Sequence, residues 1–319
     1  MILIGKNNKK DTCNDMVSSD KANSTEGIII KGVGGAYTVL TGDTIYTCKA
    51  RGIFRNKNTI PLIGDRVIID ITDEAKKIAT LHTIKPRTNE LRRPPVANVD
   101  QVIIVTTMTS PAFNAGLLDR FLLLIAYTGI PILICVNKQD LAQTNELSPY
   151  IKAGYKIVYT SATEYSGLSD LKAHMSGKIN VLAGPSGVGK SSLINALSSN
   201  HVLATGALSV KLDRGKHTTR HSEIFSLTDN TNDGFCVDTP GFTSLEIGHI
   251  PREELAALFL EFGPFLGECR FNNCLHINEK DCAVKAQIDI KIDSARYESY
   301  VKLMADYSSK FGTRGGHVK

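Results

Sequence analysis

The hydrophobic pattern divides the chain into three regions, of which the first is a series of short β-type runs. Between residues 27 and 89, brief apolar runs are separated by turns that contain glycine and aspartate. Short runs in close succession predict a small β-barrel, with an OB-fold as the leading candidate and another small β-domain as the alternative. The expected strands are 28–30, 36–40, 44–48, 66–69 and 78–81.

The second region starts near residue 98, where the apolar runs become continuous and alternate with helical segments. Continuous apolar runs are typical of strands that are buried on both faces. Their alternation with helices predicts a mostly parallel sheet with helices on both faces. The expected strands are 102–105, 131–136, 156–159, 179–183, 223–227 and 234–237, and the expected helices are 117–127 and 168–175.

The third region starts near residue 251, where the strand signals end and helices are expected at 253–262 and 294–309. A linker is expected at 91–95, where arginine and proline follow each other. The whole pattern predicts an α/β multidomain protein. Its expected parts are a polar, disordered leader at 1–26, an OB-fold at 27–92, an α/β domain at 98–246 and a helical domain at 251–319.

The composition fits a soluble globular protein of two or three domains. Hydrophobic residues make up 42% of the 319 residues and charged residues 22%, and the net charge of +5 permits an acidic partner such as nucleic acid without requiring one. The sequence has neither an apolar run of membrane-spanning length nor a signal-peptide core. We therefore expect a cytoplasmic monomer that does not associate with membranes.

Three of the seven cysteines lie close together near one histidine. Cys269, Cys274, His276 and Cys282 offer three thiolates and one imidazole within a short loop, which predicts one structural zinc ion in a closed tetrahedral site. Buried free cysteines are the alternative interpretation. A closed site leaves no position for a catalytic water, so we do not expect zinc-dependent hydrolysis.

Residues 184–191 have the G-x-x-x-x-G-K-S pattern of a phosphate-binding loop, and they lie between an apolar strand and a helical segment at 192–197. Glycines allow backbone N–H groups to surround the phosphates, and the helix N-terminus adds positive potential. Lys190 is expected to contact the β- and γ-phosphates and so to serve catalysis. The residues expected to bind nucleotide here are Gly184, Pro185, Ser186, Gly187, Val188, Gly189, Lys190, Ser191 and Ser192.

A second motif predicts that the base is guanine. Asn137, Lys138 and Asp140 form an N-K-x-D sequence directly after a predicted buried strand. Asp140 can accept hydrogen bonds from guanine N1–H and the exocyclic amine at C2, both of which adenine lacks. Ser161 and Ala162 follow the next strand, and the backbone N–H of that pair is expected to meet guanine O6.

Two further segments have the positions of switches that sense the γ-phosphate. Asp238 begins the sequence D-T-P-G, in which Gly241 is expected to contact the γ-phosphate. The loop that follows the P-loop helix carries Thr219, which is expected to close on Mg²⁺ when GTP binds, with Thr218 as the second choice. A solvated basic loop is the alternative. The expected magnesium ligands are Ser191, Thr219 and Asp238.

The residue after the D-T-P-G sequence is Phe242, which cannot hydrogen-bond an attacking water. His217 in the first switch loop is polar, titrates near neutrality and is the best local candidate for positioning that water. We therefore expect slow intrinsic hydrolysis that a partner accelerates.

The base motif precedes the P-loop in this chain, although GTPases usually have the P-loop first. This order predicts a circularly permuted nucleotide-binding domain. The motifs in this order, together with the barrel and the Cys/His loop, resemble the RsgA (YjeQ/YloQ) family of ribosome-biogenesis GTPases over residues 27–319. The resemblance implies a GTP hydrolase that binds the small ribosomal subunit and its rRNA late in assembly. It also implies that the subunit stimulates hydrolysis, that hydrolysis is coupled to release, and that His217 serves catalysis.

Two other functions remain as alternatives. The chain could be an RNA-binding structural module with a vestigial nucleotide pocket, although intact Lys190, Ser191 and Asp238 favour hydrolysis. A P-loop kinase for small molecules is disfavoured because Asp140 indicates guanine and no acceptor site is evident.

Overall fold

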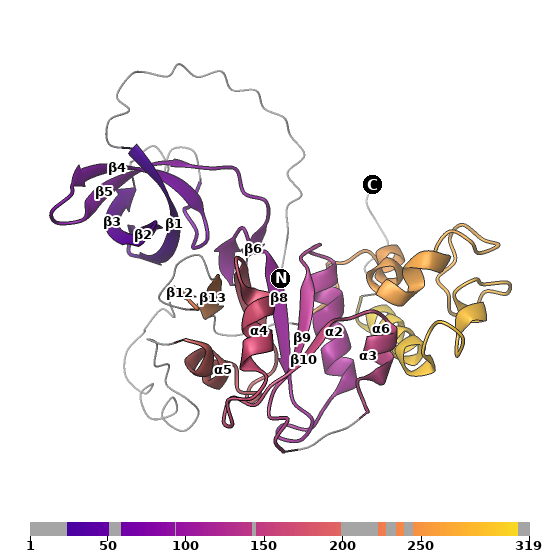
Figure 1. Cartoon of the computed structure of the whole chain (residues 1–319). Coiled ribbons are helices and arrows are strands. Elements are labelled where there is room, and N and C mark those ends of the chain that lie inside the picture. Colours follow the sequence, from indigo (N-terminus) through magenta and orange to yellow (C-terminus); the bar gives the residue numbers. More distant parts are fainter. Residues whose placement is uncertain are drawn as a thin grey trace, which may run out of the picture.

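The structure is a computed structural model that describes residues 24–50, 59–92, 94–141, 145–198, 223–227, 234–238 and 245–311. Figure 1 shows three parts in chain order: a β-barrel, a central sheet with helices beside it, and a C-terminal part with short helices and loops. The predicted α/β multidomain class is confirmed. In the described residues, no helix has the length and apolar character needed to cross a membrane.

The N-terminal part is a closed barrel, as the short apolar runs predicted. Antiparallel pairing joins β1 to β2, β2 to β3 and β4 to β5, while β3 pairs with β5 in parallel and β1 with β4 closes the barrel. Alternate residues point inward, so Ile29, Val39, Ile69 and Leu81 are fully buried. Its strands are β1 (Ser24–Val33), β2 (Ala36–Thr41), β3 (Thr44–Ala50), β4 (Arg66–Asp73) and β5 (Ile78–Ile84).

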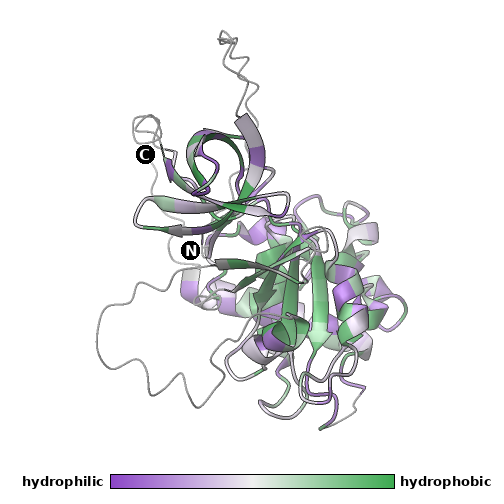
Figure 2. Ribbon diagram, turned by 60° about the vertical axis from the view of Figure 1, so that its left-hand side comes forward, coloured by the Kyte–Doolittle hydropathy of each residue, from purple (hydrophilic) through white to green (hydrophobic). Residues whose placement is uncertain are grey.

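The central sheet has the strand order β10-β9-β8-β11-β13-β12. All neighbours are parallel except β12, which is antiparallel to β13. Figure 2 shows these strands as the most hydrophobic part of the chain, as expected for strands that are covered on both faces. The strands are β8 (Gln101–Thr106), β9 (Ile132–Val136), β10 (Ile157–Tyr159), β11 (Ile179–Ala183), β12 (Glu223–Ser226) and β13 (Phe235–Asp238).

Alternation along each strand divides the core into two layers. Ile104 and Ile134 pack with the helix α2, whereas Ile103 and Leu133 pack with α4 and α5 on the opposite face. The side chain of Asn114 begins α2 by accepting a hydrogen bond from the backbone N–H of Leu117. The helices are α2 (Ala115–Ala126), α3 (Ser148–Lys152), α4 (Leu168–Met175) and α5 (Lys190–Leu197).

The barrel and the central sheet are hydrogen-bonded to each other. Strand β1 pairs antiparallel with β12 at Lys31 and Glu223, which extends the central sheet into one sheet of 11 strands. In this sheet, β12 lies between β1 of the barrel and β13, the strand that leads into the D-T-P-G sequence. A single strand therefore separates the barrel from β13.

The C-terminal part packs on helix α2. Leu123 and Leu124 of α2 share an apolar core with Phe259, Phe262 and Tyr300. The elements here are the 3-10 helices η3 (Arg252–Leu258), η4 (Leu260–Phe265) and η5 (Lys285–Gln287), and the α-helix α6 (Ser294–Phe311). The prediction of a helix at 294–309 is confirmed.

Two predicted segments differ from the structure. A single helix was expected at 253–262, but η3 and η4 are separate 3-10 helices because Phe259 between them is extended (φ −91°, ψ 109°) and Pro264 limits the second. The expected linker at 91–95 is instead part of a two-stranded ribbon of β6 (Glu90–Arg92) and β7 (Pro95–Ala97). The ribbon forms because Leu91 and Val96 are buried, and Pro95 takes the first strand position, where a missing N–H is tolerated.

A buried charge cluster joins the C-terminal part to the central domain. Arg296 of α6 donates to Asp119 of α2 and, at 2.6 Å, to Glu261 of η4. All three side chains are at most 3% exposed. The guanidinium also lies 4.8 Å from the ring centroids of both Tyr150 and Phe259. Three charges that are removed from water need such contacts, so this cluster fixes how α2, η4 and α6 meet.

Candidate functional site

The predicted nucleotide motifs meet at the carboxyl edge of the parallel strands. The segment that starts at Asn137 follows β9, the segment that starts at Thr160 follows β10, and the P-loop follows β11. Carboxyl ends of parallel strands lie on the same edge of a sheet, which explains why motifs that are far apart in sequence come together. Within the described part of the chain, the base motif, the segment after β10 and the P-loop therefore lie at the same edge of the sheet.

The P-loop requires glycine at two positions because the backbone there lies close to its neighbours. Gly184 has φ 135°, and a Cβ on it would lie 2.2 Å from the carbonyl oxygen of Val105. Gly189 has φ 91°, and a Cβ there would overlap the side-chain amide of Asn137. Both conformations are unfavourable for other residues, so the glycines determine the path of the loop.

Lys190 begins α5 and turns back over the loop. Its Nζ donates hydrogen bonds of 2.7 Å to the carbonyl oxygens of Gly184 and Pro185. The ammonium group thus lies within the curve of the P-loop, where the helix N-terminus also favours a bound anion.

Asn137 connects the three loops of this edge. Its Nδ2 donates to the carbonyl of Val188 at 2.9 Å. Its Oδ1 accepts from the backbone N–H of Ala162 at 3.2 Å and from Thr160 Oγ1 at 3.3 Å. The side chain is 1% exposed, and each of its polar atoms has a partner, so it holds the loops in a fixed spacing.

Lys138 contacts a loop that the sequence motifs did not include. Its Nζ donates to Gly187 O at 2.9 Å and to Ser110 O at 2.6 Å. Ser110 lies between β8 and α2, and Pro111 next to it lies near Gly187 of the P-loop. Sequence reasoning missed this loop because its contacts come from backbone carbonyls, which leave no side-chain signal.

Gln139 was also left out of the prediction, since it occupies the variable position of N-K-x-D. Its Nε2 donates to Ser166 Oγ at 2.7 Å and its backbone N–H donates to Thr160 O at 3.0 Å. Its neighbour Asp140 is exposed, at the end of this loop.

The switch residues lie mostly outside the described residues. This holds for His217, Thr218 and Thr219 in the first switch loop, and for Gly241 and Phe242 after the D-T-P-G sequence. Asp238 is placed as the last residue of β13, beside β11 in the sheet.

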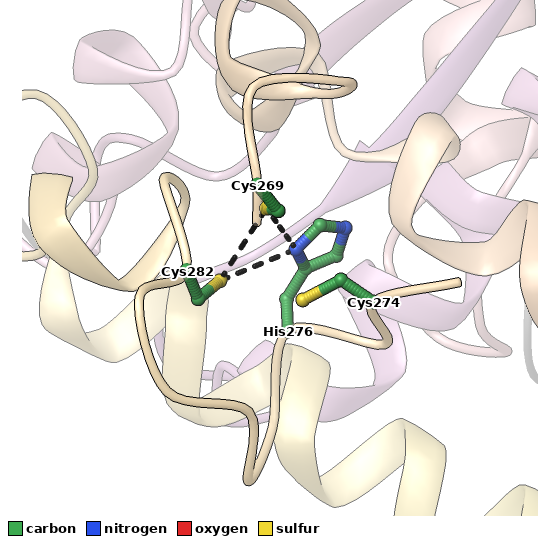
Figure 3. A group of neighbouring side chains, drawn as sticks. All are labelled: Cys269, Cys274, His276 and Cys282. Carbon is green, nitrogen blue, oxygen red and sulfur yellow. Dashed lines mark hydrogen bonds between the residues drawn. The ribbon is translucent and has the colours of Figure 1, made fainter. Parts of the chain in front are cut away.

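The three cysteines and the histidine of the C-terminal loop lie together (Figure 3). Their ligand atoms are all within 4.8 Å of one another. Cys269 Sγ lies 3.8 Å from Cys282 Sγ and 3.5 Å from His276 Nδ1. Zinc–sulfur bonds of about 2.3 Å at tetrahedral angles place two sulfurs roughly 3.8 Å apart. The donor set and its spacing therefore fit a tetrahedral zinc site.

Backbone and tyrosine contacts support this group. The N–H of Ala283 points at Cys269 Sγ (3.3 Å), and Tyr297 of α6 donates to the carbonyl of His276 at 2.8 Å. Burial lowers the pKa of His276, which Glu279 opposes, and the net shift favours the neutral imidazole that a metal ligand requires.

Glu279 holds the turn between the ligands. Its carboxylate accepts from the backbone N–H groups of Leu275 and Ile277, each at 2.9 Å. Burial alone would raise the pKa of Glu279, but these and other backbone N–H groups outweigh it and lower the pKa to about 2.

Parallel strands that bring a P-loop and N-K-x-D to one edge, with the base motif first in the chain, define a circularly permuted P-loop GTPase. The family model described as RsgA GTPase matches residues 84–248, and the model described as RsgA N-terminal domain matches residues 26–78. The chain belongs to the RsgA GTPase family and is a GTP hydrolase, for which GTP, GDP and Mg²⁺ are the implied ligands.

Named relatives and solved structures agree with this membership. The chain is 45% identical over 287 residues to the small ribosomal subunit biogenesis GTPase RsgA of Alkaliphilus metalliredigens, covering 88% of this chain and 97% of the relative. It is 47% identical over 290 residues to the protein of that name from Caldanaerobacter subterraneus, covering 89% and 96%.

The solved structures cover a similar share. The crystal structure of YloQ, described as a circularly permuted GTPase, has TM-score 0.76 and 34% identity, covering 95% of this chain and 100% of YloQ. YjeQ from Thermotoga maritima has TM-score 0.75 and 35% identity, covering 89% and 98%.

Proposed function

We propose that the protein assists the late assembly of the small ribosomal subunit, and that binding to this subunit stimulates its GTP hydrolysis. The observation that carries this function is the near-complete coverage of relatives that are named for small-subunit biogenesis, combined with an intact P-loop and base motif. On this proposal, hydrolysis is coupled to release from the subunit. The protein acts as a cytoplasmic monomer that contacts ribosomal RNA.

We assign guanine recognition to Asp140, Ala162 and Lys138. The loops of β9 and β10 place Asp140 and Ala162 on one edge, and Asn137 sets the distance between the loops. The Ala162 N–H now donates to Asn137, and it can share this hydrogen bond with guanine O6. We further propose domains at 27–92, 98–246 and 251–319, with the first extended to Ser24, because β1 begins there and residues 24–26 are not part of a disordered leader. The rest of the expected leader, residues 1–23, lies outside the described residues.

The phosphates would be held by the P-loop N–H groups and by Lys190. Nucleotide binding then replaces the two carbonyl contacts of the Lys190 ammonium with phosphate oxygens, which bear more negative charge. Ser191, Thr219 and Asp238 are the proposed magnesium ligands, and the ion would neutralise charge on the β- and γ-phosphates.

His217 is the proposed positioning group for the attacking water, because Phe242 cannot serve in this way. Cys269, Cys274, His276 and Cys282 are the proposed ligands of one structural zinc ion, which their geometry supports. With four protein ligands, the ion would stabilise the C-terminal loop and would not carry out hydrolysis.

The test compares GTP turnover of the full-length protein alone, with purified small subunits and with large subunits as the control. We expect slow turnover alone and strong stimulation by small subunits only. His217→Ala should lose the stimulated rate while it still binds GDP. Equal rates in all three mixtures, with RNA binding that does not respond to nucleotide, would instead favour the RNA-binding module.

A further inference from the structure

The loop that follows β10 has a fixed shape that its own backbone sets. Ser161 and Ser166 exchange two backbone hydrogen bonds of 3.0 and 3.1 Å, which close the loop. Tyr165 has φ 56°, a left-handed conformation that is rare for residues other than glycine. Gly167 follows with φ 68°, and a Cβ there would overlap the carbonyl oxygen of Tyr159. The loop therefore keeps its shape, so a residue that contacts it at one point also affects the position of Ala162 within it.

Gln139 is the side chain of the β9 loop that contacts the far end of this rigid loop. Its Nε2 donates to Ser166 Oγ at 2.7 Å, and its backbone N–H donates to Thr160 O at 3.0 Å. The first contact is with Ser166, which closes the β10 loop, and the second is with Thr160, which directly precedes Ser161. Asn137 contacts the near end only, through Thr160 and Ala162.

The two groups expected to read guanine come from these two separate loops. Asp140 directly follows Gln139 and is exposed, so its position depends on the residues beside it. Ala162 directly follows Ser161 inside the closed loop. A change in the distance between the loops would alter the gap between the carboxylate and the N–H, although neither group would be lost.

We propose that Gln139 is a positioning residue for guanine specificity: Asn137 fixes the near end of the β10 loop, and the hydrogen bond of Gln139 to Ser166 fixes its far end, so that both are needed to set the distance between Asp140 and Ala162. This inference rests on the proposed guanine site. The base lies between a carboxylate that accepts two hydrogen bonds and an N–H that donates one. A correct distance therefore favours guanine over a purine that lacks the exocyclic amine.

The test measures steady-state hydrolysis of GTP and ITP by the full-length Gln139→Ala protein. Hypoxanthine in ITP lacks the exocyclic amine, so it offers Asp140 one donor instead of two. Loss of one positioning hydrogen bond should raise the KM for GTP by about three- to tenfold and reduce the preference for GTP over ITP by about threefold or more. Turnover at saturating GTP should stay near wild type, because no phosphate contact changes. A merely destabilised protein would instead lose active fraction at unchanged KM.

Ser166→Ala provides the reciprocal variant. We expect it to raise the KM in the same way, and we expect Gln139→Ala to have little further effect in the Ser166→Ala background. Glu164→Ala is the matched control, since Glu164 is an exposed residue of the same loop that contacts Ser161 through its backbone N–H. Its KM should equal that of wild type.

Asp140→Ala separates failure of this inference from failure of the guanine site itself. An unchanged KM and GTP/ITP preference in Gln139→Ala, while Asp140→Ala abolishes the preference, would overturn the role of Gln139 and keep the site. If Asp140→Ala also has no effect, the proposed guanine site is wrong.

Discussion

The nucleotide edge and the C-terminal Cys/His region both hold loops in place, but they do so by different means. At the edge, parallel strands end side by side, and polar side chains such as Asn137 connect the loops that follow. In the C-terminal region, short 3-10 helices replace strands, and four possible ligand atoms lie within 4.8 Å of one another around one loop. Regular strands thus fix the loops at the edge, whereas the Cys/His loop would gain comparable order from the zinc ion proposed above.

This difference indicates a division of roles. The edge keeps groups that can contact a nucleotide, such as the Lys190 ammonium, within an open P-loop. The Cys/His region turns its polar atoms inward, with His276 5% exposed. We therefore assign chemistry to the edge and stability to the C-terminal part.

The largest effect on turnover is expected from Lys190→Ala. Removal of the ammonium from the P-loop should reduce GTP turnover by about 100-fold or more, because it stabilises developing phosphate charge. Zinc content and far-UV circular dichroism should match wild type. A variant that keeps its turnover would contradict the assignment of chemistry to this edge.

The largest effect on stability is expected from Cys282→Ser. Loss of one ligand should remove near-stoichiometric zinc, which contributes roughly 10–16 kcal/mol to the order of small zinc modules. Metal analysis and limited proteolysis of the C-terminal part provide the measurement. Wild-type protein without bound zinc would refute the metal site, whatever the variant does.

Arg296→Met tests the joint between the two regions. It leaves Asp119 and Glu261 buried without their partner, so unfolding free energy should fall by about 3–5 kcal/mol. Arg120→Met is the matched control: Arg120 pairs with Asp306 between the same two helices, but Asp306 is 49% exposed, so the loss should be about 1 kcal/mol or less. Equal losses in urea unfolding would show that burial of the cluster does not matter.

Glu279→Gln should have the smallest effect after the Arg120→Met control, about 2 kcal/mol, because the negative charge is lost and the amide NH2 cannot accept from one of the two backbone N–H groups. The pKa of Glu279 is depressed from 4.5 to about 2, so its stabilising contribution is complete above pH 4.5 and is lost as the pH falls towards 2. The difference in unfolding free energy between wild type and variant should therefore be constant from pH 8 to 5. A difference that disappears near pH 6 would contradict this.

Much of the nucleotide edge could be predicted from the sequence, because apolar runs that indicate strands are followed there by nucleotide-binding motifs. Val136 ends a continuous apolar run and Asn137 begins a polar motif, so both the strand and its functional end were evident. The roles of the site residues stay predictions. The contacts of Gln139 with Ser166 and of Lys138 with Ser110 could not be predicted, because they depend on how separate loops meet in space.

The C-terminal part was predicted less completely. Its cysteine spacing predicted a Cys/His group whose members do lie together, and the helix expected at 294–309 is α6. The break at Phe259 and the burial of Arg296 were missed, because an extended residue between short helices and an ion pair across 177 residues have no local signal.

The most direct test of the division of roles is the ratio of the dissociation constants of ADP and GDP, measured for the full-length zinc-loaded protein and for Cys282→Ser. If the edge alone reads guanine, GDP should bind about 1000-fold more tightly than ADP in both proteins, because adenine leaves Asp140 unpaired. A ratio near one in the zinc-loaded protein, or a ratio that collapses when zinc is lost, would contradict the account.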